Sequence, residues 1–251
     1  MRYELGAELY DAVGQVTGRD AAREAARVRA AWQQVLHIKR PRLLDVACGT
    51  GQHLLHLREH ADVEGADHSG AMLNVAARRL PGVPLHLQSM ERLDLPGDYD
   101  VITCLLSGIA YPLGDTRLHM ALRRMKRHLR PHGVLVVEPG PSPESVERLH
   151  ATPLLFEAEG MLVERRTRWQ QVRDELVLYH EFRVSTGGRR IALHELHEIT
   201  LRDLHAHRLA MERAGFETTL LRGEDGASPL LIGRPRSEPD AAHPMPRIEE
   251  D

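Results

Sequence analysis

Residues 42–51, with the sequence RLLDVACGTG, decide the fold of this chain. The first half is the near-continuous apolar run of a strand that is covered on both faces in a parallel sheet. Asp45 interrupts the run, and a carboxylate buried there needs a partner. Gly49 and Gly51 allow a tight turn against which a ligand can lie. A helix is predicted to begin near Gln52, so that its free N–H groups and the positive end of its dipole point at the same place.

The spacing of the glycines separates two kinds of nucleotide site. A dinucleotide-binding turn has the pattern G-x-G-x-x-G, whereas Leu54 occupies the position of the third glycine here. An acidic residue within the strand, followed by A-C-G-T-G, resembles motif I of the class I methyltransferases that use S-adenosylmethionine. The resemblance implies that Asp45, Ala47, Gly49 and Gly51 contact this cofactor. A nucleotide-binding oxidoreductase or a scaffold without a ligand is the alternative.

The bulk properties indicate a globular protein without a strong surface field. The 251 residues suffice for one α/β domain with an insertion or for two small domains. A net charge of -3 gives no reason to expect a nucleic-acid partner. Cys48 and Cys104 fall in predicted buried strands, so a disulfide framework is not indicated. The chain shows no secretory signal and no run of membrane-spanning length. We therefore expect a cytoplasmic protein without a membrane partner, and a monomer or a homodimer.

The residues before the first strand, 1–40, are predicted to form a helical lid. An alanine-rich amphipathic helix is predicted over residues 21–36. The sequence ELYD at residues 8–11 resembles the A-E-x-Y-D segment that closes over the cofactor in small-molecule methyltransferases. Tyr10 would then lie beside the sulfonium, where a cation is favourable over an aromatic ring. The alternative is that Tyr10 only packs its helix onto the domain.

An acidic residue ends the second predicted strand, which spans residues 62–67. Asp67 lies about twenty residues past the glycines, where a carboxylate can accept hydrogen bonds from both ribose hydroxyls. Alternatively, Asp67 or Ser69 caps the helix predicted over residues 70–80. Met72 falls in the first turn of that helix, where the family has an apolar contact to adenine, although plain core packing would also suit a methionine.

The segments after the third and fourth predicted strands complete the expected cofactor site. Many family members have an acid where this chain has Ser89, so we expect the adenine contact from the backbone or from Met90. The fourth strand, residues 100–105, ends at Leu105. The segment that follows, including Tyr111, meets the transferred methyl group in this family. The carboxyl ends of parallel strands are where such sheets bind ligands.

The remaining core elements complete an alternation of strands and helices. They are predicted as strands at 83–87, 134–138, 216–221 and 229–233, and as helices at 115–129 and 201–214. Thr200 is the expected cap of the last helix. The predicted fold is α/β, a Rossmann-like class I methyltransferase sheet with helices on both faces and an inserted antiparallel β-sheet cap. Residues 41–139 and 201–235 would form the S-adenosylmethionine-binding domain, and 236–251 a disordered tail.

The insertion, residues 140–200, is predicted to cover the methyl acceptor. It contains three strands with polar turns between them, at 161–170, 175–185 and 191–200. Strand alternation puts Glu195 and His197 on an otherwise apolar face. Polar groups there either belong to a site or form an internal pair that holds the sheet.

Histidine spacing does not indicate a metal site. His194 and His197 fall on opposite faces of a strand, so they cannot share an ion. His53 and His56 share a helix, but no third or fourth ligand is evident. We therefore expect no metal.

A closer resemblance extends over residues 1–235. The combination of A-E-L-Y-D, L-L-D-V-A-C-G-T-G-x-H-L, V-x-E-P and E-x-H-x-I-T-L is similar to bacterial amino-sugar N-methyltransferases. The resemblance implies N-methylation of an amino sugar or a related amine by S-adenosylmethionine. An amine acceptor needs only the removal of a proton, which can come late, whereas a hydroxyl acceptor needs a stronger base, for which His197 with Glu195 is the natural pair. Tyr111 and Tyr10 would orient the acceptor by hydrogen bonds. Alternatives are an O- or C-methyltransferase of another small metabolite, and a non-catalytic protein that binds S-adenosylmethionine.

Overall fold

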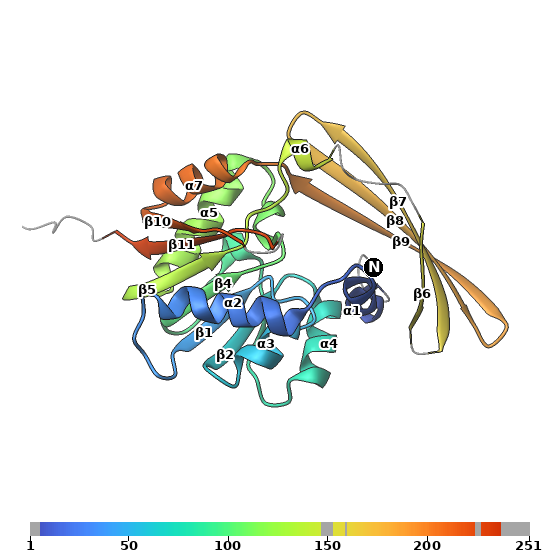
Figure 1. Ribbon diagram of the computed structural model, residues 1–251, viewed down its shortest axis with the longest axis horizontal. Helices are drawn as coiled ribbons and strands as arrows, with labels where there is room; N and C mark the ends of the chain where they lie inside the picture. The colour runs from blue at the N-terminus through green and yellow to red at the C-terminus, as the bar shows by residue number, and fades with distance from the viewer. Residues whose placement is uncertain (1–5, 147–152, 159, 224–226, 237–251) are drawn as a thin grey trace, which may run out of the picture.

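The computed structural model describes residues 6–146, 153–158, 160–223 and 227–236, which form two separate sheets (Figure 1). The larger sheet has seven strands in the order β10-β11-β5-β4-β1-β2-β3. The smaller has four strands in the order β6-β7-β8-β9 and is called the cap sheet below. The predicted tail, 236–251, lies outside the described residues except for Arg236.

The larger sheet is parallel except where β11 pairs antiparallel with β5 and β10. Its strands are β1 (Arg42–Val46), β2 (Asp62–Asp67), β3 (Leu85–Leu87), β4 (Tyr99–Cys104), β5 (Leu129–Val137), β10 (Phe216–Leu221) and β11 (Leu230–Pro235). The chain builds β1, β2 and β3 to one side and then crosses to β4 on the other side of β1. The strand order therefore reverses between β1 and β4, and such a switch point opens a crevice at the carboxyl ends of the strands.

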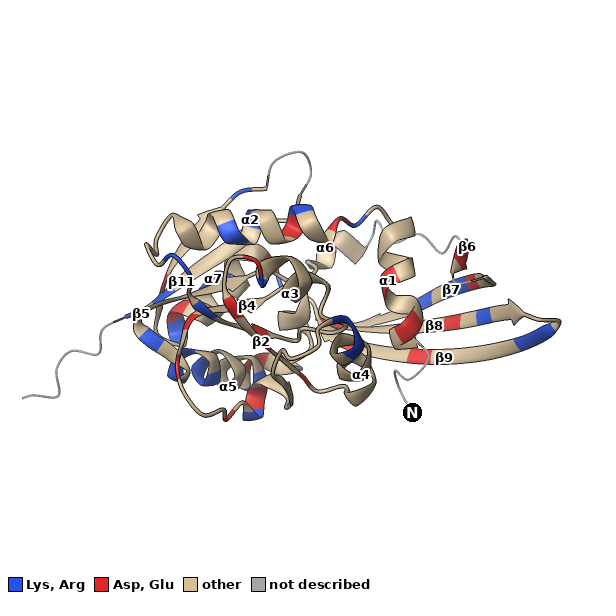
Figure 2. Ribbon diagram, turned by 90° about the horizontal axis from the view of Figure 1, so that it is seen from below, with Lys and Arg blue, Asp and Glu red and all other residues tan. Residues whose placement is uncertain are grey.

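Helices cover both faces of the larger sheet, which confirms the predicted fold class. They are α2 (Ala21–Gln33), α3 (Gln52–Leu57), α4 (Gly70–Arg79), α5 (Gly114–Arg127) and α7 (Leu204–Arg213). The helices pack into two different apolar clusters. One contains Trp32 of α2, Leu54 of α3 and Leu73 of α4, and a second contains Leu118 of α5 and Met211 of α7. Figure 2 shows α2 and α5 on opposite sides of the sheet.

The cap sheet consists of β6 (Leu154–Ala158), β7 (Met161–Val172), β8 (Glu175–Thr186) and β9 (Arg189–Thr200), all antiparallel. The sequence predicted only three of these strands and missed β6. Helix α1 (Gly6–Val16) lies between the larger sheet and the cap sheet in Figure 1. Leu9 of α1 packs in one cluster with Phe156, Val163 and Phe182 of the cap sheet. The cap sheet is therefore joined to the rest of the chain through α1 as well as through its own ends.

The predicted cap of the last helix is wrong. Helix α7 begins at Leu204, and the Asp203 side chain caps it by accepting from the N–H of Ala206. Thr200 instead ends β9, and its hydroxyl oxygen accepts the N–H of Gly114. None of the helices in the described part of the chain has the length and apolar character needed to span a bilayer.

Candidate active site

Asp45 lies at the carboxyl end of β1 and is only 2% exposed. The hydroxyl of Thr103, on the neighbouring strand β4, donates to Asp45 Oδ1 at 2.6 Å and supplies the partner that a buried carboxylate needs. Burial raises the pKa of Asp45 to about 6, although the positive charge of His53 acts in the opposite direction. The site thus contains an acid whose ionisation costs free energy in the protein without ligand.

The two glycines of the turn have different surroundings. Both have positive φ, +55° at Gly49 and +74° at Gly51, a region that favours glycine. A Cβ added to Gly51 would lie 2.7 Å from Leu80 Cδ1, so this residue is a glycine because α4 and its following residue pack against it. A Cβ added to Gly49 would meet no described atom within 4 Å. Gly49 therefore faces open space beside the turn.

Asp67, at the carboxyl end of β2, holds the turn in place. Its Oδ2 accepts the N–H of Gly49 and its Oδ1 accepts the N–H of Ser69, each at 2.8 Å. Ser69 is the N-cap of α4 and accepts the N–H of Met72. The capping role considered for this region thus belongs to Ser69, and Asp67 retains lone pairs beyond its two backbone partners.

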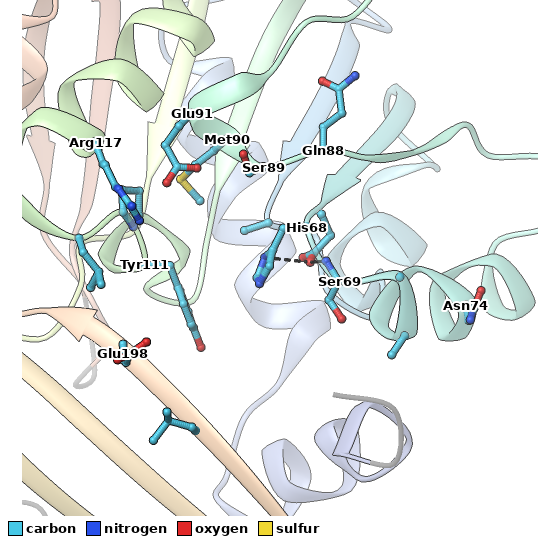
Figure 3. Close-up of a pocket in the computed structure, with 17 residues that line it drawn as sticks. His68, Ser69, Asn74, Gln88, Ser89, Met90, Glu91, Tyr111, Arg117 and Glu198 are labelled. Carbon is cyan, nitrogen blue, oxygen red and sulfur yellow. Dashed lines mark hydrogen bonds and ion pairs between the residues drawn. The ribbon is translucent and has the colours of Figure 1, made fainter. Parts of the chain in front are cut away.

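Two adjoining cavities lie at the switch point, with volumes of about 740 and 100 Å³. Both are lined by Ala47, Asp67, His68, Ser69, Met90 and Tyr111. The larger one is drawn in Figure 3, where Tyr111 faces the cavity with His68 beside it. The smaller one is also lined by residues of the turn, of α1 and of the cap sheet, namely Tyr10, Asp45, Gly49, Met72, Leu105 and His197. All the predicted cofactor residues except Gly51 therefore border this space.

The three predicted catalytic residues form one chain of contacts. The hydroxyl of Tyr111 lies 2.9 Å from Nδ1 of His197, and Nε2 of His197 lies 3.4 Å from Oε2 of Glu195. Glu195 borders neither cavity and lies behind His197, with its side chain 11% exposed. The His180 ring meets the His197 ring edge to face at 5.1 Å between centroids. Burial is the main cause that lowers the pKa of His180 to about 3, with smaller contributions from the neighbouring His197 and Arg165, so its ring is neutral.

Helix α1 is tied to the glycine turn by polar contacts. Asp11 accepts a hydrogen bond from the Thr50 hydroxyl at 2.6 Å and forms an ion pair with Arg79 of α4. The Arg79 guanidinium also donates to the carbonyl oxygen of Thr50. Tyr10 borders the smaller cavity, and burial raises its pKa. The ELYD segment is therefore fixed to the same loop that contains Gly49.

Sequence reasoning missed several charged or titratable residues that border the smaller cavity, among them Arg19 and His68. Arg19, whose guanidinium carbon lies 5.8 Å from the Tyr10 ring centroid, follows α1 in a turn that matches no motif. His68 comes directly after Asp67 and lies 3.5 Å from its Oδ1. Its place after a strand end was a usable signal, whereas Arg19 offered none.

His53 contacts a carboxylate on a neighbouring helix. His53 Nε2 lies 2.8 Å from Glu24 Oε2 of α2. In the described ranges, no three His, Cys, Asp or Glu side chains come together as a metal-binding group.

The reversal of strand order, the glycine turn after β1 and the carboxylate at the end of β2 define a nucleoside-binding fold of the class I methyltransferase type. Comparison with known proteins agrees with this class. Residues 43–133 match the family described as "Methyltransferase domain".

Curated relatives extend the similarity over nearly the whole chain. A dTDP-3-amino-3,6-dideoxy-alpha-D-glucopyranose N,N-dimethyltransferase of Streptomyces fradiae is 36% identical over 231 residues, covering 91% of this chain and 90% of the relative. A dTDP-4-amino-2,3,4,6-tetradeoxy-D-glucose N,N-dimethyltransferase of Saccharopolyspora spinosa is 34% identical over 239 residues, covering 90% and 91%.

Solved structures give the same result. A sugar N-methyltransferase from Streptoalloteichus superposes with a TM-score of 0.82 at 33% identity, covering 92% of this chain and 94% of that one. An amino pentose methyltransferase from Micromonospora echinaspora, solved with S-adenosylmethionine bound, gives 0.77 at 29% identity, covering 90% and 96%. The chain belongs to the class I S-adenosylmethionine-dependent methyltransferases, in the family that contains these sugar N-methyltransferases. The enzyme class and the cofactor predicted from the sequence are confirmed.

Proposed function

We propose that this enzyme methylates the amino group of a nucleotide-linked amino sugar. The curated relatives described above are named for dTDP-linked amino sugars. The observation that carries the proposal is that the glycine turn and the polar residues of the cap sheet border two adjoining cavities with shared lining residues. A methyl donor at the turn and an acceptor beneath the cap sheet would meet there. We propose residues 1–40 as a lid and 140–200 as the acceptor cap of a monomer or homodimer that has no nucleic-acid partner.

The residues at the turn fit S-adenosylmethionine. The open space beside Gly49 admits a ligand against the backbone, and Gly51 shapes the turn. The ring of Tyr10 would lie by the sulfonium, and Asp67 would accept from the ribose hydroxyls. Apolar and backbone contacts would come from Ala47, Met72, Met90 and Leu105.

Asp45 and Arg19 border the smaller cavity, and their side chains fit the two charges of a methionine group. Asp45 would face the ammonium, and Arg19 would face the carboxylate. Binding an ammonium beside Asp45 would favour its ionised form, which burial disfavours in the protein without ligand. Cofactor binding and the ionisation of Asp45 would therefore be coupled.

Bound S-adenosylmethionine supplies a methyl group that is already activated as a sulfonium. The chain then has to align the acceptor nitrogen, exclude water and take one proton. With Nε2–H of His197 directed at Glu195, Nδ1 accepts from the hydroxyl of Tyr111. The amine would give its proton to the Tyr111 oxygen as the hydroxyl proton passes to His197. The carboxylate of Glu195 would stabilise the imidazolium.

The test is incubation with isotopically labelled S-adenosylmethionine and a panel of dTDP-linked amino sugars and their hydroxyl counterparts, read by mass spectrometry. We expect label on the sugar nitrogen and none on the hydroxyl counterparts. Label on oxygen or carbon alone would overturn the amine proposal, and so would cofactor binding without transfer to any sugar in the panel. In the same assay, the His197→Ala variant should show a lower kcat. The affinity of this variant for S-adenosylhomocysteine, measured by calorimetry, should stay at the wild-type value.

A further inference from the structure

A second hydrogen bond runs alongside the Tyr111–His197 contact and joins the same two segments. Tyr111 precedes α5 and His197 lies on β9, with 2.9 Å between the hydroxyl and Nδ1. Three residues further along each segment, the N–H of Gly114 donates to the hydroxyl oxygen of Thr200 at 3.2 Å. Because the two bonds connect the same segments at neighbouring points, the second limits the distances over which the first can form.

The Gly114–Thr200 bond is shielded from solvent on its acceptor side. Thr200 is 0% exposed, so water cannot readily replace its hydroxyl. Loss of that oxygen would leave the half-buried N–H of Gly114 without its side-chain acceptor at the start of α5. The segment between Tyr111 and Gly114 would then be free to shift relative to β9.

A third contact at the same junction involves a buried charge. Nε and Nη2 of Arg202 lie 3.4 and 3.3 Å from Oδ1 of Asp115, the residue after Gly114. The Arg202 side chain is 5% exposed, and its Nη1 has no hydrogen-bond partner within the described part of the chain. Arg202 lies two residues beyond the end of β9, so this contact joins the same two segments a third time.

We propose that Thr200 is a positioning residue that holds β9 against the start of α5. In that position Nδ1 of His197 stays within hydrogen-bond reach of the Tyr111 hydroxyl. Thr200 borders neither cavity, so it acts only through this pair. The inference rests on the catalytic role proposed above for Tyr111 and His197.

Two substitutions separate the hydroxyl from the bulk of the side chain. Thr200→Val keeps the volume and removes the acceptor, and we expect kcat to fall about tenfold, the scale on which a misaligned catalytic pair loses rate. The affinity for S-adenosylhomocysteine, measured by calorimetry, should not change, because the cofactor residues lie elsewhere. Thr200→Ser retains the oxygen and should recover kcat to within about twofold. A kcat for Thr200→Val equal to that of the wild type would overturn the proposal.

A double-mutant cycle with Tyr111→Phe distinguishes positioning from general loosening. If Thr200 acts through Tyr111, adding Thr200→Val to Tyr111→Phe should change kcat by less than about twofold. An undiminished tenfold effect in that background would overturn the proposal. If Tyr111→Phe alone leaves kcat unchanged, the catalytic pair itself fails, and the inference fails with it.

Two further variants control for stability. Thr218, in β10, has a hydroxyl that donates to Glu212 of α7 at 3.0 Å. Thr218→Val removes this hydroxyl and should leave kcat unchanged. If Thr200→Val cannot be purified, Asp115→Ala removes the third contact from an exposed position, where the side chain is 86% exposed. We expect Asp115→Ala to lower kcat about threefold in the wild type and not in the Tyr111→Phe background. An unchanged kcat in the wild type would overturn the proposal.

Discussion

Asp45→Asn should stabilise the protein without ligand increasingly as the pH rises. Asp45 is buried, and its pKa rises from an ordinary 3.8 to about 6. Because the folded pKa exceeds the unfolded one, the unfolded chain loses this proton first, and stability falls as the pH rises between these values. The difference between the two pKa values corresponds to roughly 3 kcal/mol at neutral pH. Asparagine does not titrate and does not incur this cost.

The magnitude can be separated from the other effects of the substitution. Asparagine can still accept from the Thr103 hydroxyl, while its buried amide N–H groups incur a cost that does not depend on pH. Between pH 4.5 and 7.5 the titration of Asp45 changes stability by about 2 kcal/mol. The free energy of unfolding of Asp45→Asn relative to wild type should therefore increase by about that amount over this range.

Urea unfolding followed by circular dichroism at pH 4.5 and 7.5 measures this difference. Asp100→Asn is a matched control, because Asp100 is also buried but is held by Arg130 at 2.7 Å, and its loss should destabilise at both pH values. We also expect Asp45→Asn to bind S-adenosylmethionine at least about tenfold more weakly, because a charge-assisted bond is lost. A relative stability that stays constant with pH, within about 0.5 kcal/mol, would refute the reasoning.

Two further predictions concern the residues around the turn. Asp67→Ala should weaken S-adenosylhomocysteine binding by about 1–3 kcal/mol, as measured by calorimetry. Ser69→Ala, which removes the cap of α4, should lower the free energy of unfolding by only about 1 kcal/mol. Wild-type affinity for Asp67→Ala would count against the ribose role. Asp11→Asn, which breaks an ion pair whose side chains are 15% and 23% exposed, should speed dissociation of S-adenosylhomocysteine about tenfold in stopped-flow measurements, a scale that corresponds to about 1.4 kcal/mol. The exposed Glu8→Gln control should change the rate less than about twofold, and equal effects of the two would contradict the special role of Asp11.

The fold was predictable because its signals are local. The apolar strand, the paired glycines and Asp67 belong to one continuous stretch, and parallel strands bring their carboxyl ends together. The alternation of Glu195 and His197 along one strand also predicted their shared face. These features depend on spacing along the chain, which a sequence records directly.

The rest depended on contacts between distant segments. Strand β6 is short and is defined by its pairing with β7, which no local pattern reveals. Thr200 and Asp203 are both residue types that cap helices. In the structure the Thr200 hydroxyl accepts from Gly114, which is far away in sequence, and Asp203 caps α7. Arg19 reaches the cavity only because α1 packs where it does. The sequence also could not tell that Gly51 serves packing while Gly49 faces open space beside the turn.

Calorimetric titration of Gly49→Val with S-adenosylhomocysteine tests the central claim, that the turn after β1 holds the cofactor, most directly. Gly82→Val is the matched control, because Gly82 also has positive φ, +82°, and an added Cβ there would meet no described atom within 4 Å. Both substitutions incur a similar backbone cost, but of the two glycines only Gly49 borders the smaller cavity. We predict that Gly49→Val shows no measurable heat of binding while Gly82→Val binds as the wild type does. Wild-type affinity in folded Gly49→Val would contradict the account.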